Sequence, residues 1–147
     1  MTIEIRSFTT ADTDPVVELW HAVGLTRPWN DPYRDIERKL EVQPELLLVA
    51  HDGDVLVGTV MAGYDGHRGW LYYLASAPGR RGEGIARALV AEAESRLLAM
   101  GCPKVQLMVR PENDVARGFY GALDYEPFDT WATGKRLIED GPAPTAS

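Results

Sequence analysis

The feature that most constrains the fold is a short glycine-rich loop between two different hydrophobic patterns. Residues 80–86 read Arg-Arg-Gly-Glu-Gly-Ile-Ala, after an aromatic-rich apolar run at residues 70–76 and before a helical pattern that continues to Met100. This order predicts a strand, a tight loop and the first turn of a helix. Glycines let backbone N–H groups turn toward a ligand, and a helix start favours an anion. The loop is therefore either a phosphate-binding site or only a tight connection.

Length and hydropathy limit the domain organisation. The chain has 147 residues, which suits one domain, and we place that domain at residues 1–140 with a loose tail at residues 141–147. No apolar run is long enough to span a bilayer, so no membrane partner is expected. The first residues lack the pattern of a signal peptide, which predicts a cytoplasmic location.

Charge and cysteine content exclude several classes of site. The net charge of −7 argues against a nucleic-acid-binding surface and suits a cationic partner. Cys102 is the only cysteine, so neither an internal disulfide nor a cysteine-based metal cluster is expected. The three histidines show no metal-ligand spacing, and we therefore predict no metal site.

Hydrophobic periodicity in the rest of the chain predicts an α+β fold with a mixed, mostly antiparallel sheet. Asp52-Gly53-Asp54 lies between two apolar runs and predicts a hairpin, which makes three antiparallel strands before the glycine-rich loop. We expect six or seven strands flanked by about four helices. Strands are expected at residues 3–8, 46–51, 55–62, 70–76 and 104–109, with one or two more between 125 and 137. Helices are expected at residues 14–23, 31–42, 85–100 and 113–123.

This order of elements, with two motifs, resembles the GNAT superfamily of N-acetyltransferases. The acetyl-CoA loop of that family reads Gln/Arg-x-x-Gly-x-Gly/Ala after a strand, and residues 81–86 match it. A later Asn-x-x-Ala-x-x-x-Tyr element matches Asn113, Ala116 and Tyr120. The resemblance extends over residues 3–139 and implies a GNAT-like fold.

Three further segments, at residues 27–32, 63–69 and 134–140, resemble a bacterial subfamily of these acetyltransferases. One departure from the family pattern follows the tyrosine helix, where Asp124 replaces the usual glycine of Leu-Gly-Tyr/Phe. Because aspartate tolerates left-handed backbone better than most residues, we expect the turn to survive.

The resemblance implies acetyl-CoA as the acetyl donor. The strand at residues 74–76 would pair with the pantetheine arm, a backbone N–H near Leu74 or Ala75 would face the thioester oxygen, and the loop would bind the pyrophosphate. The candidate donor-binding residues are Leu74, Ala75, Ser76, Arg80, Arg81, Gly82, Glu83, Gly84, Ile85, Ala86, Asn113 and Tyr120.

Catalytic roles are assigned less directly. Tyr120 is the candidate general acid for the leaving thiolate, and the alternative is simple packing beside Phe119. Asp65 and His67 are candidate general bases. The alternative is that the residues of this segment only form a tight turn. The candidate acceptor-binding residues are Trp29, Asn30, Asp31 and Tyr72, and Asp31 is a further candidate base.

The predicted function is transfer of an acetyl group from acetyl-CoA to a primary amine, on a small molecule or a protein, by direct attack on the thioester. The alternative is a module that binds and senses acyl-CoA without turnover. A dinucleotide fold is disfavoured, because the loop lacks Gly-x-Gly-x-x-Gly and follows antiparallel strands. The oligomeric state is open, with a homodimer as one option.

Overall fold

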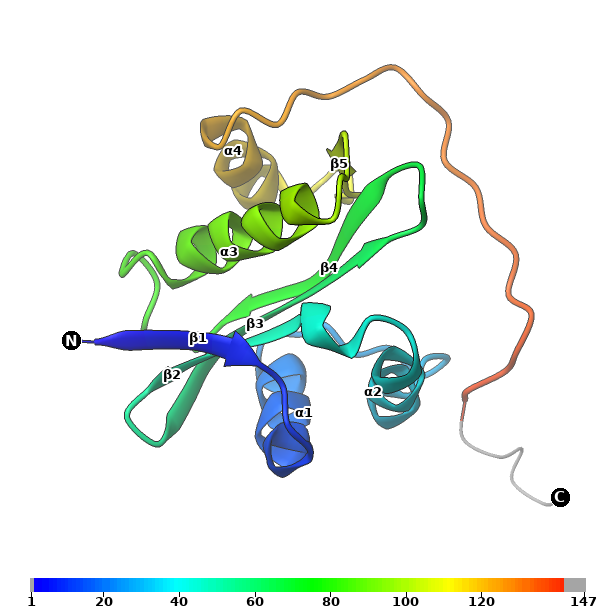
Figure 1. The fold of residues 1–147 in the computed structure, drawn as a ribbon. Coiled ribbons are helices and arrows are strands. Elements are labelled where there is room, and N and C mark those ends of the chain that lie inside the picture. The colour runs from blue at the N-terminus through cyan, green and yellow to red at the C-terminus, as the bar shows by residue number, and fades with distance from the viewer. Residues whose placement is uncertain (1, 142–147) are drawn as a thin grey trace, which may run out of the picture.

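The computed structural model describes residues 2–141, in which one five-stranded sheet lies between two layers of helices (Figure 1). The strands are β1 (Ile3–Ser7), β2 (Leu47–Asp52), β3 (Val55–Tyr64), β4 (Gly69–Ser76) and β5 (Val105–Gln106), and they lie in the order β1-β2-β3-β4-β5. The first four pair antiparallel, and β5 pairs parallel to β4. The predicted mixed, mostly antiparallel sheet is therefore confirmed.

Four α-helices cover the sheet, as predicted. Among residues 2–141 these are α1 (Thr13–Ala22), α2 (Pro32–Glu41), α3 (Ile85–Ala99) and α4 (Asp114–Ala122), with short 3-10 turns at Thr10–Asp12 and Pro44–Leu46. In Figure 1, α1 and α2 lie on one side of the sheet and α3 and α4 on the other. No helix in this part of the chain combines the length and the apolarity needed to cross a membrane.

Local sequence signals account for the helix ends. The Asp31 side chain accepts from the Tyr33 N–H at 2.9 Å and caps α2, with Pro32 as its first residue. Gly101 has a φ of 87° just after α3 and allows the chain to leave the helix. These three positions are ones that the sequence predicts.

The core forms two clusters, one on each face of the sheet. Leu89 and Leu97 of α3 belong to one cluster, and Trp20 of α1 belongs to the other. At Gly58 the packing of α3 on β3 is so close that an added Cβ would lie 2.7 Å from the Ile85 Cγ2 atom. The start of α3 is therefore held tightly against the sheet.

The prediction of six or seven strands is wrong for the described residues, because the segment after Tyr125 does not join the sheet. It follows an extended path around the outside of the molecule (Figure 1), with Trp131 86% and Leu137 87% exposed. A strand needs a partner and a buried face, and Gly134 with its charged neighbours offers neither. The predicted tail at residues 141–147 lies outside the described residues, apart from Gly141.

Candidate active site

The glycine-rich loop connects β4 to α3, as predicted, and its backbone takes conformations that favour glycine. Gly82 and Gly84 have φ values of 85° and 82°, and no atom lies within 4 Å of where a Cβ would be. Gly84 is also the N-cap of α3 and has no side chain to accept from the first N–H groups of that helix. The N-terminus of α3 is thus open to an anionic ligand.

The two arginines at the loop have different environments. Arg80 donates to the Asp52 carboxylate at 2.9 Å and to the Glu83 carboxylate at 3.0 Å, and these two acids raise the pKa of its guanidinium. It therefore ties the loop to the turn between β2 and β3. Arg81 is exposed, and its charge faces solvent. Of the two, Arg81 is the better placed to meet a phosphate.

One edge of β4 lacks a strand partner over most of its length. β5 pairs only with Gly69 and Trp70 at the beginning of β4. From Leu71 to Ser76 no strand in residues 2–141 pairs with that edge, although the opposite edge is paired with β3. An extended chain with amide groups could add to this edge, next to Leu74, Ala75 and Ser76.

A β-bulge interrupts β4 at the first of these residues. Val60 of β3 lies opposite two residues of β4, Tyr73 and Leu74, where the register shifts. Tyr73 has a φ of 53°, which is uncommon for a residue with a Cβ. The alternation of side chains along β4 therefore changes at the point where the predicted thioester site begins.

The Asn and Tyr of the second motif both lie on α4. Asn113 caps the helix, because its Oδ1 accepts from the Ala116 N–H at 3.1 Å. Tyr120 is half-buried, and its ring meets Phe119 and Tyr125 edge-on at 5.1 and 5.5 Å. Burial raises the pKa of Tyr120 to about 12. The phenol therefore stays protonated at neutral pH.

The chain accommodates Asp124 after α4, in place of the glycine of the family pattern, as expected. Asp124 has a φ of 69°, and its N–H donates to the Gly121 carbonyl at 3.1 Å. Tyr125 then donates from its hydroxyl to Glu94 of α3 at 2.7 Å. The left-handed turn thus forms with aspartate in place of glycine.

The two candidate bases lie in the turn between β3 and β4. The Asp65 carboxylate accepts from the N–H groups of His67 and Arg68 at 2.8 and 2.7 Å, and these bonds lower its pKa. No hydrogen bond within residues 2–141 holds the His67 ring. The strand from Gly69 to Leu74 separates this turn from the bulge by about 15 Å. The structure does not bring either side chain to the bulge.

The candidate acceptor loop before α2 is brought to β4. The Asn30 amide donates to the Tyr73 hydroxyl at 3.0 Å, and Tyr72 beside it is 45% exposed. Trp29 is 51% exposed on the outer side of the same loop. Asp31 uses its carboxylate as the cap of α2. The structure thus brings Asn30 to Tyr73, the residue that follows Tyr72 in β4.

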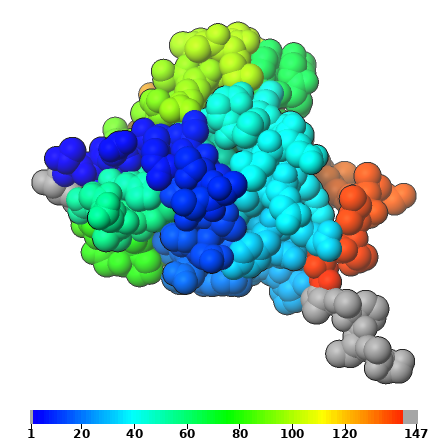
Figure 2. Space-filling model, turned by 60° about the horizontal axis from the view of Figure 1, so that its bottom comes forward, coloured from blue at the N-terminus to red at the C-terminus, as the bar shows by residue number. Residues whose placement is uncertain are grey.

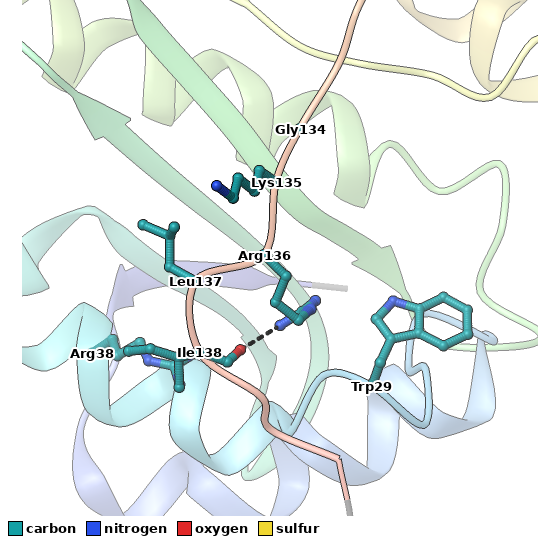
Figure 3. A pocket seen from close by; sticks show the side chains of 7 residues that line it. All are labelled: Trp29, Arg38, Gly134, Lys135, Arg136, Leu137 and Ile138. Carbon is teal, nitrogen blue, oxygen red and sulfur yellow. Dashed lines mark hydrogen bonds between the residues drawn. The ribbon is translucent and has the colours of Figure 1, made fainter.

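Trp29 also lines a surface hollow of about 590 Å³ together with Arg38 and residues 134–138 (Figure 3). Arg136 points toward Trp29 and donates to the Ile138 carbonyl, whereas Lys135 points the other way. Figure 2 shows the same C-terminal segment, in orange, beside the cyan surface that includes α2. Residues 134–138 thus form part of the lining of the hollow. Most of this segment was predicted from the sequence to be a strand of the sheet, and that prediction is wrong.

The C-terminal segment is attached to α2 by an ion pair. The buried Asp140 carboxylate accepts from both terminal nitrogens of Arg38, and this contact lowers the pKa of Asp140. Arg38 also lies 3.3 Å from Asp35. Among the described residues, no group of three or more histidine, cysteine, aspartate or glutamate side chains is placed to hold a metal ion.

Sequence reasoning missed the residues that join the acceptor loop to β4, namely Tyr73, Asp35 and Thr59. The one available signal is the Tyr72-Tyr73 pair, in which alternation would place the rings on opposite faces of the strand. The bulge removes that alternation, and a bulge has no clear mark in this sequence.

Comparison with known proteins agrees with this arrangement. Residues 13–125 match the family model described as the acetyltransferase (GNAT) family. An acetyltransferase of Pectobacterium atrosepticum is 54% identical over 138 residues, which cover 94% of this chain and 98% of the relative. An acetyltransferase of Sodalis glossinidius is 52% identical over 139 residues, with the same coverage of both chains.

Solved structures share the fold at low sequence identity. The aminoglycoside acetyltransferase AAC(6')-Iy, in complex with a CoA-containing bisubstrate analogue, has a TM-score of 0.78 at 19% identity, covering 94% of this chain and 100% of its own. A predicted acetyltransferase from Clostridium acetobutylicum, with acetyl-CoA, has a TM-score of 0.72 at 16% identity, covering 91% and 96%. The family match and the relatives together show that the chain belongs to the GNAT family of acetyltransferases.

Proposed function

We propose that this protein moves the acetyl group of acetyl-CoA to a primary amine, on a small molecule or a protein, by direct attack on the thioester. The observation that carries the proposal is that the unpaired edge of β4 leads directly into the glycine-rich loop and the open N-terminus of α3. Two solved neighbours, one in complex with a CoA-containing analogue and one with acetyl-CoA, support the same donor here. The net charge of −7 favours a cationic acceptor.

The donor would lie along β4 and across the loop. The pantetheine amides would pair with the backbone of residues 74–76, as an added strand does. The pyrophosphate would meet the N–H groups of residues 81–86, where glycine φ values near 80° turn the backbone outward. Arg81 would supply the cation, because Arg80 is already held by Asp52 and Glu83.

In the reaction, the amine nitrogen attacks the thioester carbonyl carbon, a C–N bond forms and the C–S bond breaks. A backbone N–H of Leu74 or Ala75 would stabilise the developing oxyanion. The Tyr120 hydroxyl would donate a hydrogen bond to the departing thiolate. Because its pKa of about 12 lies well above the ~8.5 of a thiol, Tyr120 stabilises the thiolate better than it protonates it.

The acceptor amine is an ammonium at neutral pH and must lose a proton before its nitrogen can attack. His67 is the candidate base with a ring that faces solvent, whereas Asp65 uses its carboxylate to hold the turn. Since this turn lies about 15 Å from Leu74, a base there lies outside hydrogen-bond reach of the attacking nitrogen and would need a relay of several waters. Replacement of His67 by glutamine should then lower turnover.

A two-step experiment tests the proposal. Titration calorimetry with acetyl-CoA and CoA should give saturable binding. Release of CoA thiol should then follow addition of at least one member of a panel of polyamines, amino acids, aminoglycosides and peptide amino termini. Absence of acetyl-CoA binding would falsify the proposal at its first step.

A second candidate function is an acyl-CoA sensor without turnover. The raised pKa of Tyr120 favours it, because a phenol of this kind is a poor proton donor. A sensor would bind acetyl-CoA but release no thiol with any amine, and Tyr120→Phe would leave binding unchanged. The same amine panel therefore separates the two functions.

A further inference from the structure

We infer that Tyr73 is a positioning residue that links the acceptor loop to the backbone that faces the thioester, and that Thr59 and Asp35 hold it in place. The inference rests on the proposed function, since it concerns the oxyanion donor at Leu74. Tyr73 directly precedes that residue and forms the β4 bulge with it.

The backbone of Tyr73 is held in an uncommon conformation. Its φ of 53° lies in the left-handed region, which side chains with a Cβ rarely adopt. The Tyr73 carbonyl accepts from the Thr59 hydroxyl at 2.8 Å, and the Thr59 oxygen in turn accepts from the Trp20 indole N–H at 2.9 Å. Thr59 and Trp20 are fully buried, so no solvent competes for these bonds.

The side chain of Tyr73 is held as firmly as its backbone. Its ring stacks on Trp20 with centroids 3.8 Å apart. Its hydroxyl donates to the Asp35 carboxylate at 2.6 Å and accepts from the Asn30 amide at 3.0 Å. Burial and the Asp35 carboxylate both raise the pKa of the Tyr73 phenol, so it remains a donor.

These contacts connect two parts of the site that are far apart in the chain. Asn30 and Asp35 belong to the acceptor loop and α2, whereas the Tyr73 backbone sets the direction of the next N–H, that of Leu74. A strained residue persists only where its surroundings fix it, and such residues gather at functional sites. Loss of either anchor should let the bulge relax and turn the Leu74 N–H away from the thioester oxygen.

Two variants test the two anchors. Thr59→Val removes the hydroxyl that fixes the Tyr73 carbonyl, and Thr59→Ser restores it. Tyr73→Phe removes only the hydroxyl and keeps the ring stacked on Trp20. Tyr64→Phe is the matched control, because it removes a tyrosine hydroxyl on β3 that contacts the Gly101 carbonyl instead of the acceptor loop.

The first readout is the infrared carbonyl stretch of bound acetyl-CoA labelled with ¹³C at the acetyl carbonyl. A backbone donor lowers this frequency below that of free acetyl-CoA, and Thr59→Val and Tyr73→Phe should return it toward the free value. The second readout is turnover, which should fall about 10- to 100-fold with acetyl-CoA affinity unchanged. Thr59→Ser and Tyr64→Phe should behave as the wild type.

The outcomes separate the inference from the proposed function. If the wild type does not bind acetyl-CoA, the proposed function fails and the inference fails with it. The wild type could instead bind acetyl-CoA and lower the carbonyl stretch but acetylate no amine. That result would refute the proposed acetyl transfer, and the infrared comparison of the variants would still test the positioning role of Tyr73. An unshifted stretch in the wild type, or an unchanged stretch in Tyr73→Phe, overturns the inference alone. Should Thr59→Val not fold, Tyr73→Phe decides.

Discussion

The proposed donor side and the proposed acceptor side of this site are built in different ways. The donor side is a continuous stretch of chain, from the bulge in β4 through the glycine-rich loop to the first turn of α3, and backbone groups form most of it. The acceptor side is made of side chains from distant segments: Asn30 meets Tyr73, and Arg38 meets Asp140. A backbone site tolerates side-chain change, whereas a side-chain site changes with each substitution.

The largest effect should come from Gly84→Val on the donor side. Gly84 has a φ of 82°, so valine would strain the N-cap by about 1–3 kcal/mol and place its side chain at the open end of α3. We expect calorimetry to show a loss of acetyl-CoA affinity of about 100-fold. The control is Gly118→Ala in α4, where nothing lies within 4 Å and no loss of affinity is expected. Wild-type affinity in Gly84→Val would contradict a phosphate site at this loop.

Tyr120→Phe should lower turnover by about 10- to 100-fold, because the departing thiolate loses a hydrogen-bond donor. The Michaelis constant for acetyl-CoA should stay the same. Since the pKa of Tyr120 is about 12, wild-type turnover should show no loss from phenol ionisation up to about pH 10. Tyr125→Phe is the control, because its hydroxyl is bound to Glu94. Equal turnover in Tyr120→Phe and the wild type would exclude the thiolate role.

Arg81→Ala should raise the Michaelis constant for acetyl-CoA about 5- to 10-fold at low salt, because an exposed charge near the phosphates is lost. The ratio between variant and wild type should shrink as salt is added, and Arg81→Lys should recover most of the affinity. A constant ratio at all salt concentrations would show that Arg81 acts through loop structure and not through charge.

The smallest effect should come from the acceptor side, with Asp140→Asn. Loss of the Arg38 ion pair should loosen the C-terminal segment and raise the Michaelis constant for the amine about 2- to 3-fold, with that for acetyl-CoA unchanged. The pKa of Asp140 is lowered in the folded protein, so the stabilisation is present above the ordinary carboxyl pKa near ~4 and is lost as pH falls through the lowered value. Thermal melts should therefore separate the variant from the wild type at pH 7 and converge as the pH falls below the ordinary carboxyl pKa.

Asp129→Asn is the control for that comparison, because Asp129 is exposed on the same segment. A change in the Michaelis constant for acetyl-CoA in Asp140→Asn, or melts that stay separate in acid, would show that the ion pair does not act on the acceptor side alone.

The two sides also differ in how far the sequence predicts them. Donor-side features depend on neighbouring residues: Asn113 caps α4, and the glycines of the loop take left-handed backbone, both as expected. These positions follow from local backbone chemistry, which needs only a few consecutive residues.

Acceptor-side features depend on contacts that no local pattern records. The residues after Tyr125 were predicted to form strands, yet they run outside the sheet and return through Asp140, 102 residues away from its partner Arg38. The contact between α2 and Tyr73 depends on Asp35, 38 residues away in the chain, and the bulge, where the two sides meet, depends on Thr59 of the neighbouring strand. Propensity alone cannot specify such partners.

The central claim is that the donor and acceptor sides meet at the β4 bulge and transfer an acetyl group there. The most direct measurement counts CoA thiol released and acetylated amine formed in the same reaction, with the amine that is most active in the panel. The account predicts one thiol for each acetylated amine, with saturation in both substrates. Saturable binding of acetyl-CoA without thiol release for any amine would contradict it.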